Sequence, residues 1–234
     1  MSGKKQTGFT IVELLVVIAI IAAITAILLP GMGKARGLAY RLRCASNLRQ
    51  IDLALRAYMD RNNDTYPCSS DPCYILWPGR KWRPFIAPYL GGSIDGNNPY
   101  VLWCQQDRYS KLNYDSTSYA YSMSFYHSSE QIDNLVYTPT QSEQFFNTPP
   151  VGQHSTSVAK PSGKIVVGEW LSNHSSINAN DGACGWWCQT GKRNYLFADG
   201  QVRLIDAGDI RTAHDGFPNP NVTINGIRGI DWPR

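Results

Sequence analysis

The sequence predicts an α+β protein in which a long N-terminal helix packs on a small, antiparallel, β-rich head. Three observations lead to this prediction: an apolar segment over residues 9–29, an amphipathic segment with helical spacing after it, and short strand-like runs within a region rich in Gly, Pro, Tyr and Trp. The predicted parts, in order, are a leader over 1–8, a transmembrane helix over 9–30, an amphipathic helix continuing it over 31–62, and a globular head over 63–234.

The composition of the 234-residue chain excludes several classes of protein. Hydrophobic residues make up 43%, so the chain can bury a core and is not a disordered tail. Charged residues are 17%, below the roughly 25% of a typical soluble protein. The formal net charge is only +4, whereas a nucleic-acid-binding domain usually concentrates basic residues on one face. We therefore expect no nucleic-acid partner.

The apolar segment over 9–29 is long enough to cross a membrane. Its polar residues are Thr10, Glu13 and Thr25. At a rise of about 1.5 Å per residue it spans about 31 Å, close to the hydrocarbon thickness of a bilayer. Two lysines precede it, and positive flanks stay in the cytoplasm, so the rest of the chain should lie outside the cytoplasm. A secretory signal peptide matches less well because its apolar core is shorter and ends in a small-residue cleavage site.

Glu13 is the acidic residue of this apolar segment. A carboxylate within a membrane span is costly, by about 2.5–3.5 kcal/mol at the centre and by less near the end. A plain membrane anchor gives no reason for this cost, so the sequence indicates that Glu13 has a partner.

The segment from Gly31 to Asn62 has the spacing of an amphipathic helix. Apolar residues recur every three or four positions along much of it, at Leu38, Leu42, Ala45, Leu48, Leu55 and Tyr58. Arginines mostly occupy the other faces, where they indicate a solvated surface or a contact between subunits. The helix should fray at Asn62-Asn63-Asp64 and end before Pro67.

Short strands are expected in the head. The candidate strands are Tyr100–Trp103, Ser118–Tyr126, Lys164–Trp170, Asn194–Ala198 and Gln201–Ile205. Asp199-Gly200 separates the last two, and this dipeptide is a strong signal for a two-residue β-hairpin turn. We therefore expect Asp199 to serve the turn.

The six cysteines suggest disulfides if the head is exported. Six cysteines allow fifteen pairings, and the sequence by itself does not select one. The preferred set consists of two short-range pairs and one distant pair, Cys68–Cys73, Cys184–Cys188 and Cys44–Cys104. The distant pair would fasten the head to the long helix, and closing such a loop stabilises by about 4 kcal/mol. Zinc is the alternative, because both short-range pairs loosely match the C-x₂₋₄-C spacing of zinc ligands.

The sequence shows no motif of an enzyme, so no catalytic residue is assigned. The four histidines lack H-E-x-x-H spacing, and neither a nucleophile elbow nor a phosphate-binding glycine loop is present. Nothing in the sequence places a second carboxylate beside Glu169 for glycoside hydrolysis. An alternative function is a membrane-anchored extracytoplasmic carbohydrate-binding module, because such modules stack aromatic rings on sugars. The tryptophans that suit it are Trp77, Trp82, Trp186, Trp187 and Trp232.

The residues Gly8-Phe9-Thr10-Ile11-Val12-Glu13 resemble the type IV prepilin signal. That signal has a short basic leader ending in Gly, a Phe that becomes the new N-terminus, and a Glu at the fifth mature position. Pro30 falls at mature position 22, where pilins commonly carry a helix-kinking proline. The resemblance implies a pilin-like fold, cleavage between Gly8 and Phe9 by a prepilin peptidase, and methylation of the Phe9 amine.

The resemblance also supplies a partner for Glu13. In a growing filament, Glu13 of an incoming subunit is expected to pair with the Phe9 amine of a neighbouring subunit. An unpaired buried charge costs several kcal/mol, whereas a paired charge is tolerated. The pair would therefore set the register of assembly more than it would add stability.

Further residues resemble a group of bacterial pseudopilin-like proteins, which are related to the major pseudopilins of type II secretion. The matching segments are the run from Cys44 to Ile51, Cys104-Gln105-Gln106-Asp107 and the Asp-Gly hairpin over 194–202. One departure is Gln189, which stands where the group often has a His ten residues before the Asp of the hairpin. Major pseudopilins carry a calcium site in a C-terminal loop. Calcium is therefore a candidate cofactor, and its weak candidate ligands are Asp181, Asp199 and Asp206.

These resemblances imply a structural subunit of a type IV pilus-like or type II secretion pseudopilus filament. Such a subunit forms a helical polymer with copies of itself. Its other implied partners are a prepilin peptidase, an inner-membrane assembly platform and an assembly ATPase. It would lie in the inner membrane before assembly and in a periplasmic or extracellular filament afterwards.

Overall fold

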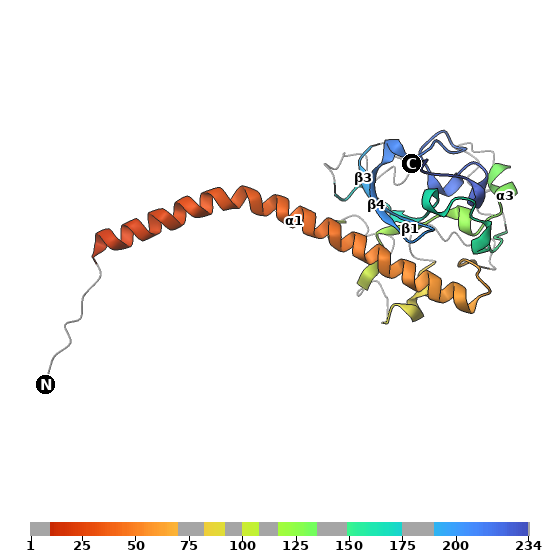
Figure 1. Ribbon diagram of the computed structural model, residues 1–234, viewed down its shortest axis with the longest axis horizontal. Helices are drawn as coiled ribbons and strands as arrows, with labels where there is room; N and C mark the ends of the chain where they lie inside the picture. Colours follow the sequence, from red (N-terminus) through yellow and green to blue (C-terminus); the bar gives the residue numbers. More distant parts are fainter. Residues whose placement is uncertain are drawn as a thin grey trace. The chain divides into compact units, whose positions relative to one another are not determined.

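The computed structural model describes residues 10–69, 82–91, 100–107, 117–134, 149–174 and 190–233 (Figure 1). The chain divides into two compact units, the first ending at Ala39 and the second running from Tyr40 onward. Helix α1 (Ile11–Arg61) contributes to both units. The helix and a four-stranded antiparallel sheet confirm the predicted α+β class.

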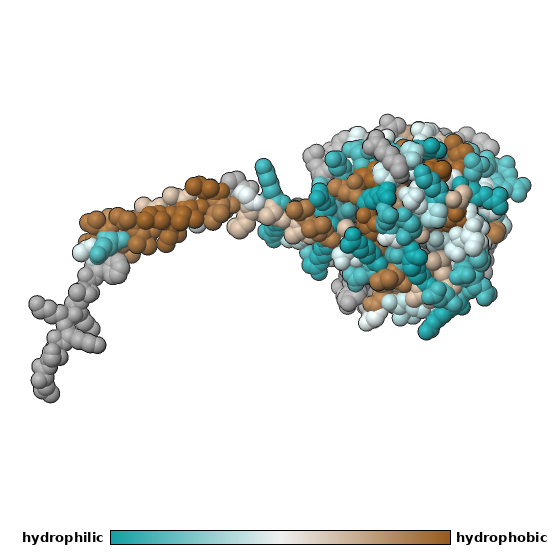
Figure 2. Space-filling model, in the orientation of Figure 1, coloured by the Kyte–Doolittle hydropathy of each residue, from teal (hydrophilic) through white to brown (hydrophobic). Residues whose placement is uncertain are grey.

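The N-terminal part of α1 is apolar on all sides. Ile11–Leu29 is the one segment of the described residues that is long and apolar enough to cross a membrane, and all of its side chains are exposed. Figure 2 shows this apolar surface in brown along the helix. The Thr25 hydroxyl donates to the carbonyl of Ile21 at 2.8 Å, so this polar group is satisfied within the helix itself.

The second half of α1 is amphipathic, as its spacing predicts. It buries residues at intervals of three and four, namely Cys44, Leu48, Ile51 and Leu55. The helix ends at Arg61, and Asn63 and Asp64 then take positive φ angles of 51° and 52°. The Asp64 amide donates to the Met59 carbonyl at 3.0 Å and closes the last turn. The predicted end of the helix before Pro67 is therefore confirmed.

The sheet has the strand order β1-β2-β3-β4, with every neighbouring pair antiparallel. Its strands are β1 (Tyr119–Tyr121), β2 (Ile165–Glu169), β3 (Lys192–Phe197) and β4 (Val202–Asp206). The turn between β3 and β4 contains Asp199-Gly200, and Gly200 has a φ of +86°. The predicted hairpin is therefore confirmed.

Two predicted strands differ from the structure. Tyr100–Trp103 was expected to be a strand, but Tyr100–Leu102 forms a 3₁₀ helix, η2. A short apolar run does not by its pattern distinguish a strand from a buried helical turn. The strand expected over Ser118–Tyr126 stops at Tyr121, because the Ser122 hydroxyl accepts a hydrogen bond from the Ser124 amide at 3.3 Å and begins another 3₁₀ helix, η4 (Met123–Phe125).

The sheet separates two buried clusters of side chains. On one face, Tyr119, Tyr121 and Leu196 share a cluster with the buried residues of α1. On the other face, Ala120 and Tyr195 belong to a second cluster. Adjacent residues of one strand thus face opposite sides, as the pleat requires. Two short helices, α2 (Arg83–Ile86) and α3 (Ser129–Asp133), add Ile86 and Ile132 to the cluster that contains α1.

A buried ion pair holds the C-terminal segment to the start of β2. The Lys164 Nζ lies 3.3 Å from an Asp231 carboxylate oxygen, and the Ile165 amide donates to the same carboxylate at 2.7 Å. Burial lowers the pKa of Lys164 and raises that of Asp231, since each loses water around its charged form. The pair fixes the strand that ends at Glu169.

Candidate functional site

Glu13 lies in the first turn of α1, where it bonds to its own chain. Its Oε2 atom accepts from the Thr10 amide at 2.9 Å and from the Thr10 hydroxyl at 2.8 Å. The Thr10 hydroxyl oxygen accepts in turn from the Glu13 amide at 3.3 Å. These reciprocal bonds form a capping box, which satisfies amide groups that the first turn of a helix leaves unpaired. Gly8 and Phe9 lie outside the described residues, so the predicted cleavage site is not placed.

The helix that follows Glu13 exposes its large apolar side chains. Ile11 is 78% exposed, Leu14 58% and Ile18 52%. So much apolar surface is unfavourable in water, and lipid or other apolar helices must cover it. The helix continues through position 30, where the sequence places Pro30, to Arg61.

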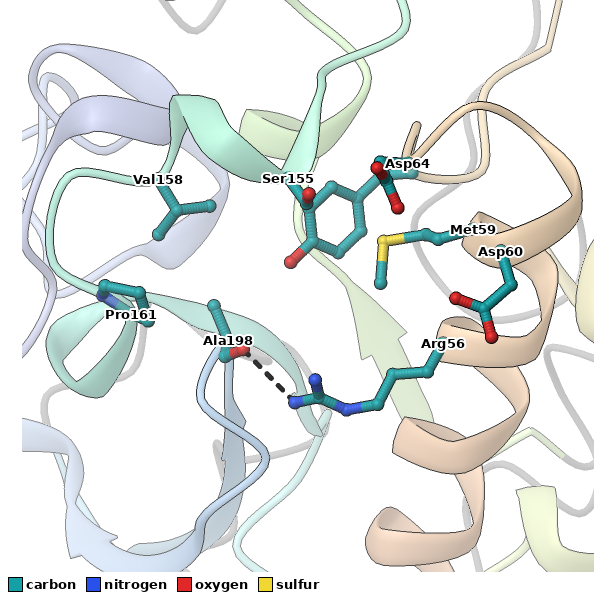
Figure 3. A pocket seen from close by; sticks show the side chains of 9 residues that line it. Arg56, Met59, Asp60, Asp64, Ser155, Val158, Pro161 and Ala198 are labelled. Atoms are coloured by element: carbon teal, nitrogen blue, oxygen red, sulfur yellow. Dashed lines mark hydrogen bonds between the residues drawn. The ribbon is translucent and has the colours of Figure 1, made fainter.

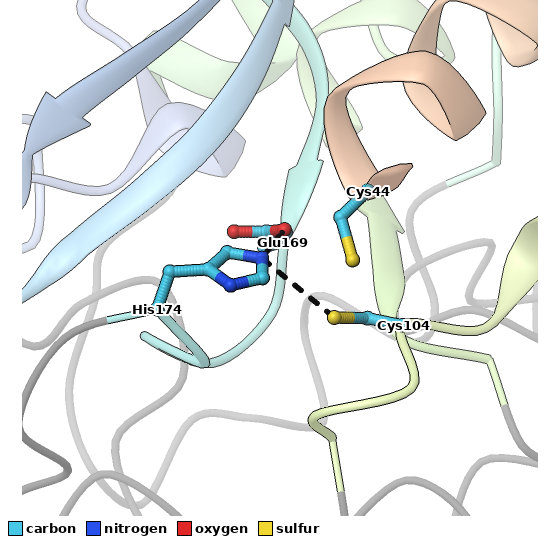
Figure 4. Close-up of side chains that lie close together, drawn as sticks. All are labelled: Cys44, Cys104, Glu169 and His174. Atoms are coloured by element: carbon cyan, nitrogen blue, oxygen red, sulfur yellow. Dashed lines mark hydrogen bonds and ion pairs between the residues drawn. The ribbon is translucent and has the colours of Figure 1, made fainter. Parts of the chain in front are cut away.

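A second candidate site lies inside the head and brings four separate segments together (Figure 4). Cys44 projects from α1, Cys104 follows η2, Glu169 ends β2, and His174 stands in the turn after β2. One potential ligand atom from each side chain lies within 4.8 Å of the others. The Nε2 atom of His174 is 2.8 Å from Glu169 Oε1 and 3.7 Å from Cys104 Sγ.

Local hydrogen bonds explain why these segments meet. Ser118 ties Cys104 to the end of β2: its hydroxyl accepts from the Cys104 amide at 2.9 Å, and its carbonyl accepts from the Trp170 amide at 2.9 Å. Asn47, one turn after Cys44, donates to the Trp103 carbonyl at 3.3 Å. The helix turn that carries Cys44 is therefore held against the residue that precedes Cys104.

Two amide side chains orient the histidine and the carboxylate. Gln106 Oε1 lies 2.5 Å from His174 Nδ1, so this ring nitrogen is the donor toward Gln106. Asn194 donates to Glu169 twice, through its backbone amide at 2.8 Å and through its side-chain Nδ2 at 2.9 Å. The His174 side chain is 1% exposed and the Glu169 side chain 0%, so water does not compete for these bonds.

The pKa values of three side chains in the cluster are shifted, and not all in the same direction. The pKa of Cys44 falls to about 6, because Cys104 hydrogen-bonds to it and outweighs the effect of burial, and His174 adds to the fall. The pKa of Cys104 rises for the reciprocal reason. Burial lowers the pKa of His174, but hydrogen bonds to Cys44 and Glu169 outweigh it and raise the pKa to about 9. The shifts of Cys44 and His174 have opposite directions, so together they favour the charged forms of both side chains.

The structure brings Cys44 and Cys104 together, as the preferred pairing requires, but records both as free cysteines. The disulfide between them stays a prediction. Cys68 is also free, and burial raises its pKa to about 11. Its expected partner Cys73, and the pair Cys184 and Cys188, lie outside the described residues.

Two of the weak calcium candidates serve turns. Asp199 Oδ1 accepts from the Gln201 amide at 2.9 Å, as expected for a hairpin residue, and Asp206 Oδ1 accepts from the Gly208 amide at 3.2 Å. Asp181 lies outside the described residues. Within the described ranges, neither Asp199 nor Asp206 belongs to a group of metal-ligand side chains, so calcium stays a prediction.

The tryptophans proposed for sugar binding are partly used for packing. Trp82 is fully buried and stacks on Tyr121 with ring centroids 5.7 Å apart, so it offers no face to a sugar. The Arg203 guanidinium covers the Trp232 ring at 4.5 Å. Trp77, Trp186 and Trp187 lie outside the described residues. The described part of the head thus removes Trp82 from the carbohydrate-binding hypothesis.

A hollow of about 300 Å³ lies between the end of α1 and the β3–β4 hairpin (Figure 3). Residues that line it include Arg56, Asp60, Tyr66, Ser155 and Ala198. Arg56 donates to the Ala198 carbonyl at 3.4 Å and pairs with Asp52 at 2.9 Å. The bond to Ala198 joins the hairpin to the helix, and Asp52 holds the Arg56 side chain from within the helix.

Sequence reasoning missed the buried site because only two of its residues are near each other in the chain. Glu169 and His174 are five residues apart, which is no metal-binding or catalytic spacing. The one sequence feature that points to the site is a predicted strand that ends in an acidic residue, Glu169, and is followed five residues later by a histidine, His174.

Comparison with known proteins concerns the N-terminal segment. Residues 3–29 match the family model of the prokaryotic N-terminal methylation motif. The match confirms the prepilin-type signal, and with the apolar helix it is consistent with a membrane-anchored precursor. Neither the curated proteins nor the solved structures gave a match to the chain. At the family level, the signal is that of a type IV pilin-like or pseudopilin-like subunit.

Proposed function

We propose that this chain is a structural subunit of a type IV pilus-like or type II secretion pseudopilus filament, assembled through its N-terminal helix. One observation carries the proposal: the methylation motif over 3–29 coincides with a helix, Ile11–Leu29, whose apolar side chains are all exposed. A monomer in lipid hides that surface in the bilayer, and a filament hides it among neighbouring helices.

Processing prepares the subunit for assembly. A prepilin peptidase removes residues 1–8 and methylates the new amine of Phe9, which is a cation at the membrane edge. The carboxylate of Glu13 then has two alternative partners, the Thr10 donors of its own chain and the Phe9 amine of a neighbour. Because an unpaired charge in an apolar helix bundle costs several kcal/mol, only the register that pairs them is favoured.

The subunit acts by assembly and carries out no catalysis of its own. An inner-membrane platform and an assembly ATPase move it from the inner membrane into a periplasmic or extracellular filament. Apolar helices form the filament core, and the heads cover the outside. Each head then needs only modest lateral contacts.

The test replaces the charge of Glu13 and keeps its cap. Glu13→Gln retains an oxygen that accepts from Thr10, so the helix start is preserved. We expect filament incorporation, measured by immunoblot of sheared fibres and by electron microscopy, to fall at least tenfold, while membrane insertion stays unchanged. The matched control is Thr10→Ala, which removes the hydroxyl that donates to Glu13 and keeps the carboxylate. This variant should still assemble. Normal filaments from Glu13→Gln would contradict the proposal.

A further inference from the structure

We propose that Cys44, Cys104, Glu169 and His174 form a structural zinc site inside the head. The proposal is independent of filament assembly, because all four residues belong to the unit that begins at Tyr40.

The donor set fits zinc by chemistry. Two thiolates and one imidazole are the ligands that Zn²⁺ prefers, and a carboxylate is an accepted fourth ligand. Calcium and magnesium take oxygen ligands almost exclusively, so a pair of cysteines excludes them. Four protein ligands also complete a tetrahedral shell and leave no open position for a substrate, which is typical of structural sites.

The spacing of the donors fits a tetrahedron around one ion. With zinc bonds of about 2.3 Å to sulfur and about 2.0 Å to nitrogen, two such ligands of one tetrahedral ion lie about 3.5 Å apart. Cys104 Sγ and His174 Nε2 are 3.7 Å apart. His174 Nε2 and Glu169 Oε1 are closer, at 2.8 Å, because they share a hydrogen bond. Binding replaces that bond with two bonds to the metal, so these atoms separate by about half an ångström.

The surroundings of the ligands have the form of a metal site. A histidine that binds a metal through one ring nitrogen usually donates the other to an oxygen, which fixes the orientation of the ring. His174 Nδ1 meets Gln106 Oε1 in this way, and Nε2 faces Glu169 and Cys104. The carboxylate of Glu169 is oriented in turn by both donors of Asn194.

Burial adds a reason for a cation. Cys44 and Cys104 are 2% and 0% exposed, and the side chains of Glu169 and His174 are 0% and 1% exposed. A divalent ion bound among these four side chains would be shielded from water, and its charge would balance the negative charges of the ligands that bind it. The ion would join α1 to the segment after η2 and to the end of β2.

The experiment measures metal in the full-length protein, extracted in detergent from cells whose free thiols are preserved. We expect about one zinc per chain by elemental analysis. Replacement with Co²⁺ should give the intense visible absorption of a tetrahedral site together with sulfur-to-metal charge transfer. Gln106→Ala keeps all four ligands and should weaken zinc binding at least tenfold, since it frees the histidine ring.

Variants of the ligands separate this site from other thiols. Cys104→Ser and His174→Ala should each lose zinc, and neither should give the cobalt spectrum of the native chain. Cys68→Ser is the matched control, because Cys68 is free and lies outside the cluster, and it should bind zinc as the native chain does. The proposal is overturned if thiols blocked in intact cells leave Cys44 and Cys104 joined as a disulfide, or if zinc is bound without sulfur in its spectrum.

Discussion

Two carboxylates of this protein lie in apolar surroundings, and each has specific hydrogen-bond partners. Glu13 is held by Thr10 at the start of α1. Glu169 lies in the head between Asn194 and His174. In both places the partner offsets the cost of removing a carboxylate from water. His127 is the contrasting case, because its buried Nδ1 has no hydrogen-bond partner in the described part of the chain.

The stability of the head should therefore depend on pH through His127. Burial outweighs a hydrogen bond with Gln131 and lowers the pKa of His127 from 6.5 to about 4. Protonation thus favours the unfolded chain, whose histidine has the ordinary pKa. The stabilising effect is complete above about pH 6.5 and is lost as the pH falls toward 4, at up to about 1.4 kcal/mol per pH unit, or roughly 3 kcal/mol in total.

Denaturant unfolding of the native chain and of His127→Phe, at intervals from pH 7 to pH 4, measures this effect. The difference in unfolding free energy between the two proteins should change with pH, since carboxylates titrate equally in both. A difference that stays constant over this range would show that His127 is not buried in its neutral form.

At the scale of elements, α1 meets two environments along one continuous helix. Its first part is apolar on all sides, and its second part buries only one face against the sheet. The β3–β4 hairpin contacts that second part through Arg56, whose guanidinium also pairs with Asp52 one turn earlier in the helix. The close approach requires Gly200: a Cβ there would lie 2.8 Å from Asp52 Oδ2 and 3.0 Å from Arg56 Nη2.

Gly200→Ala should destabilise the head for two separable reasons. Its φ of +86° lies in the left-handed region, where a side chain costs about 1–2 kcal/mol, and its Cβ would displace the Asp52–Arg56 pair. Gly216→Ala is the matched control, because Gly216 has a φ of +81° and open space around it. Thermal or denaturant unfolding should show a larger loss for Gly200→Ala, and Arg56→Ala should reduce that loss. Equal losses of stability in the two variants would mean that the hairpin does not approach Asp52 and Arg56 closely.

At the scale of the whole molecule, the chain has two parts, an apolar helix and a folded head. The methylation motif and apolar helix are consistent with a membrane-anchored precursor. The second unit has its own buried clusters on both faces of its sheet. The proposed function requires such a division, because the helix would assemble while the head stays folded.

The mature chain should begin at Phe9 and carry one methyl group on its amine. Intact mass spectrometry of the membrane-extracted protein, with fragmentation of its N-terminus, checks this directly. Gly8→Val should keep residues 1–8, because the added side chain obstructs the cleavage site. A native chain recovered with its leader attached would rule out the processing step.

Local features could be predicted from the sequence alone. The apolar run over 9–29, the end of α1 before Pro67 and the turn at Asp199-Gly200 all depend on neighbouring residues. Periodicity and backbone preference act over a few positions, so they can be recognised without the fold. The prepilin-type signal is local for the same reason.

Only the tertiary structure decided the 3₁₀ turn after the long helix and the buried cluster of four side chains, because both depend on residues far apart in the chain. Burial of a short apolar run selected a 3₁₀ turn at Tyr100–Leu102, where the pattern also allowed a strand. Cys44, Cys104 and His174 are separated by sixty or more residues, and no spacing rule links them. They meet because packing of α1 on the sheet and the hydrogen bonds of Ser118 bring their segments together. A site built from such long-range contacts follows from packing, whereas a helix or a hairpin follows from its own residues.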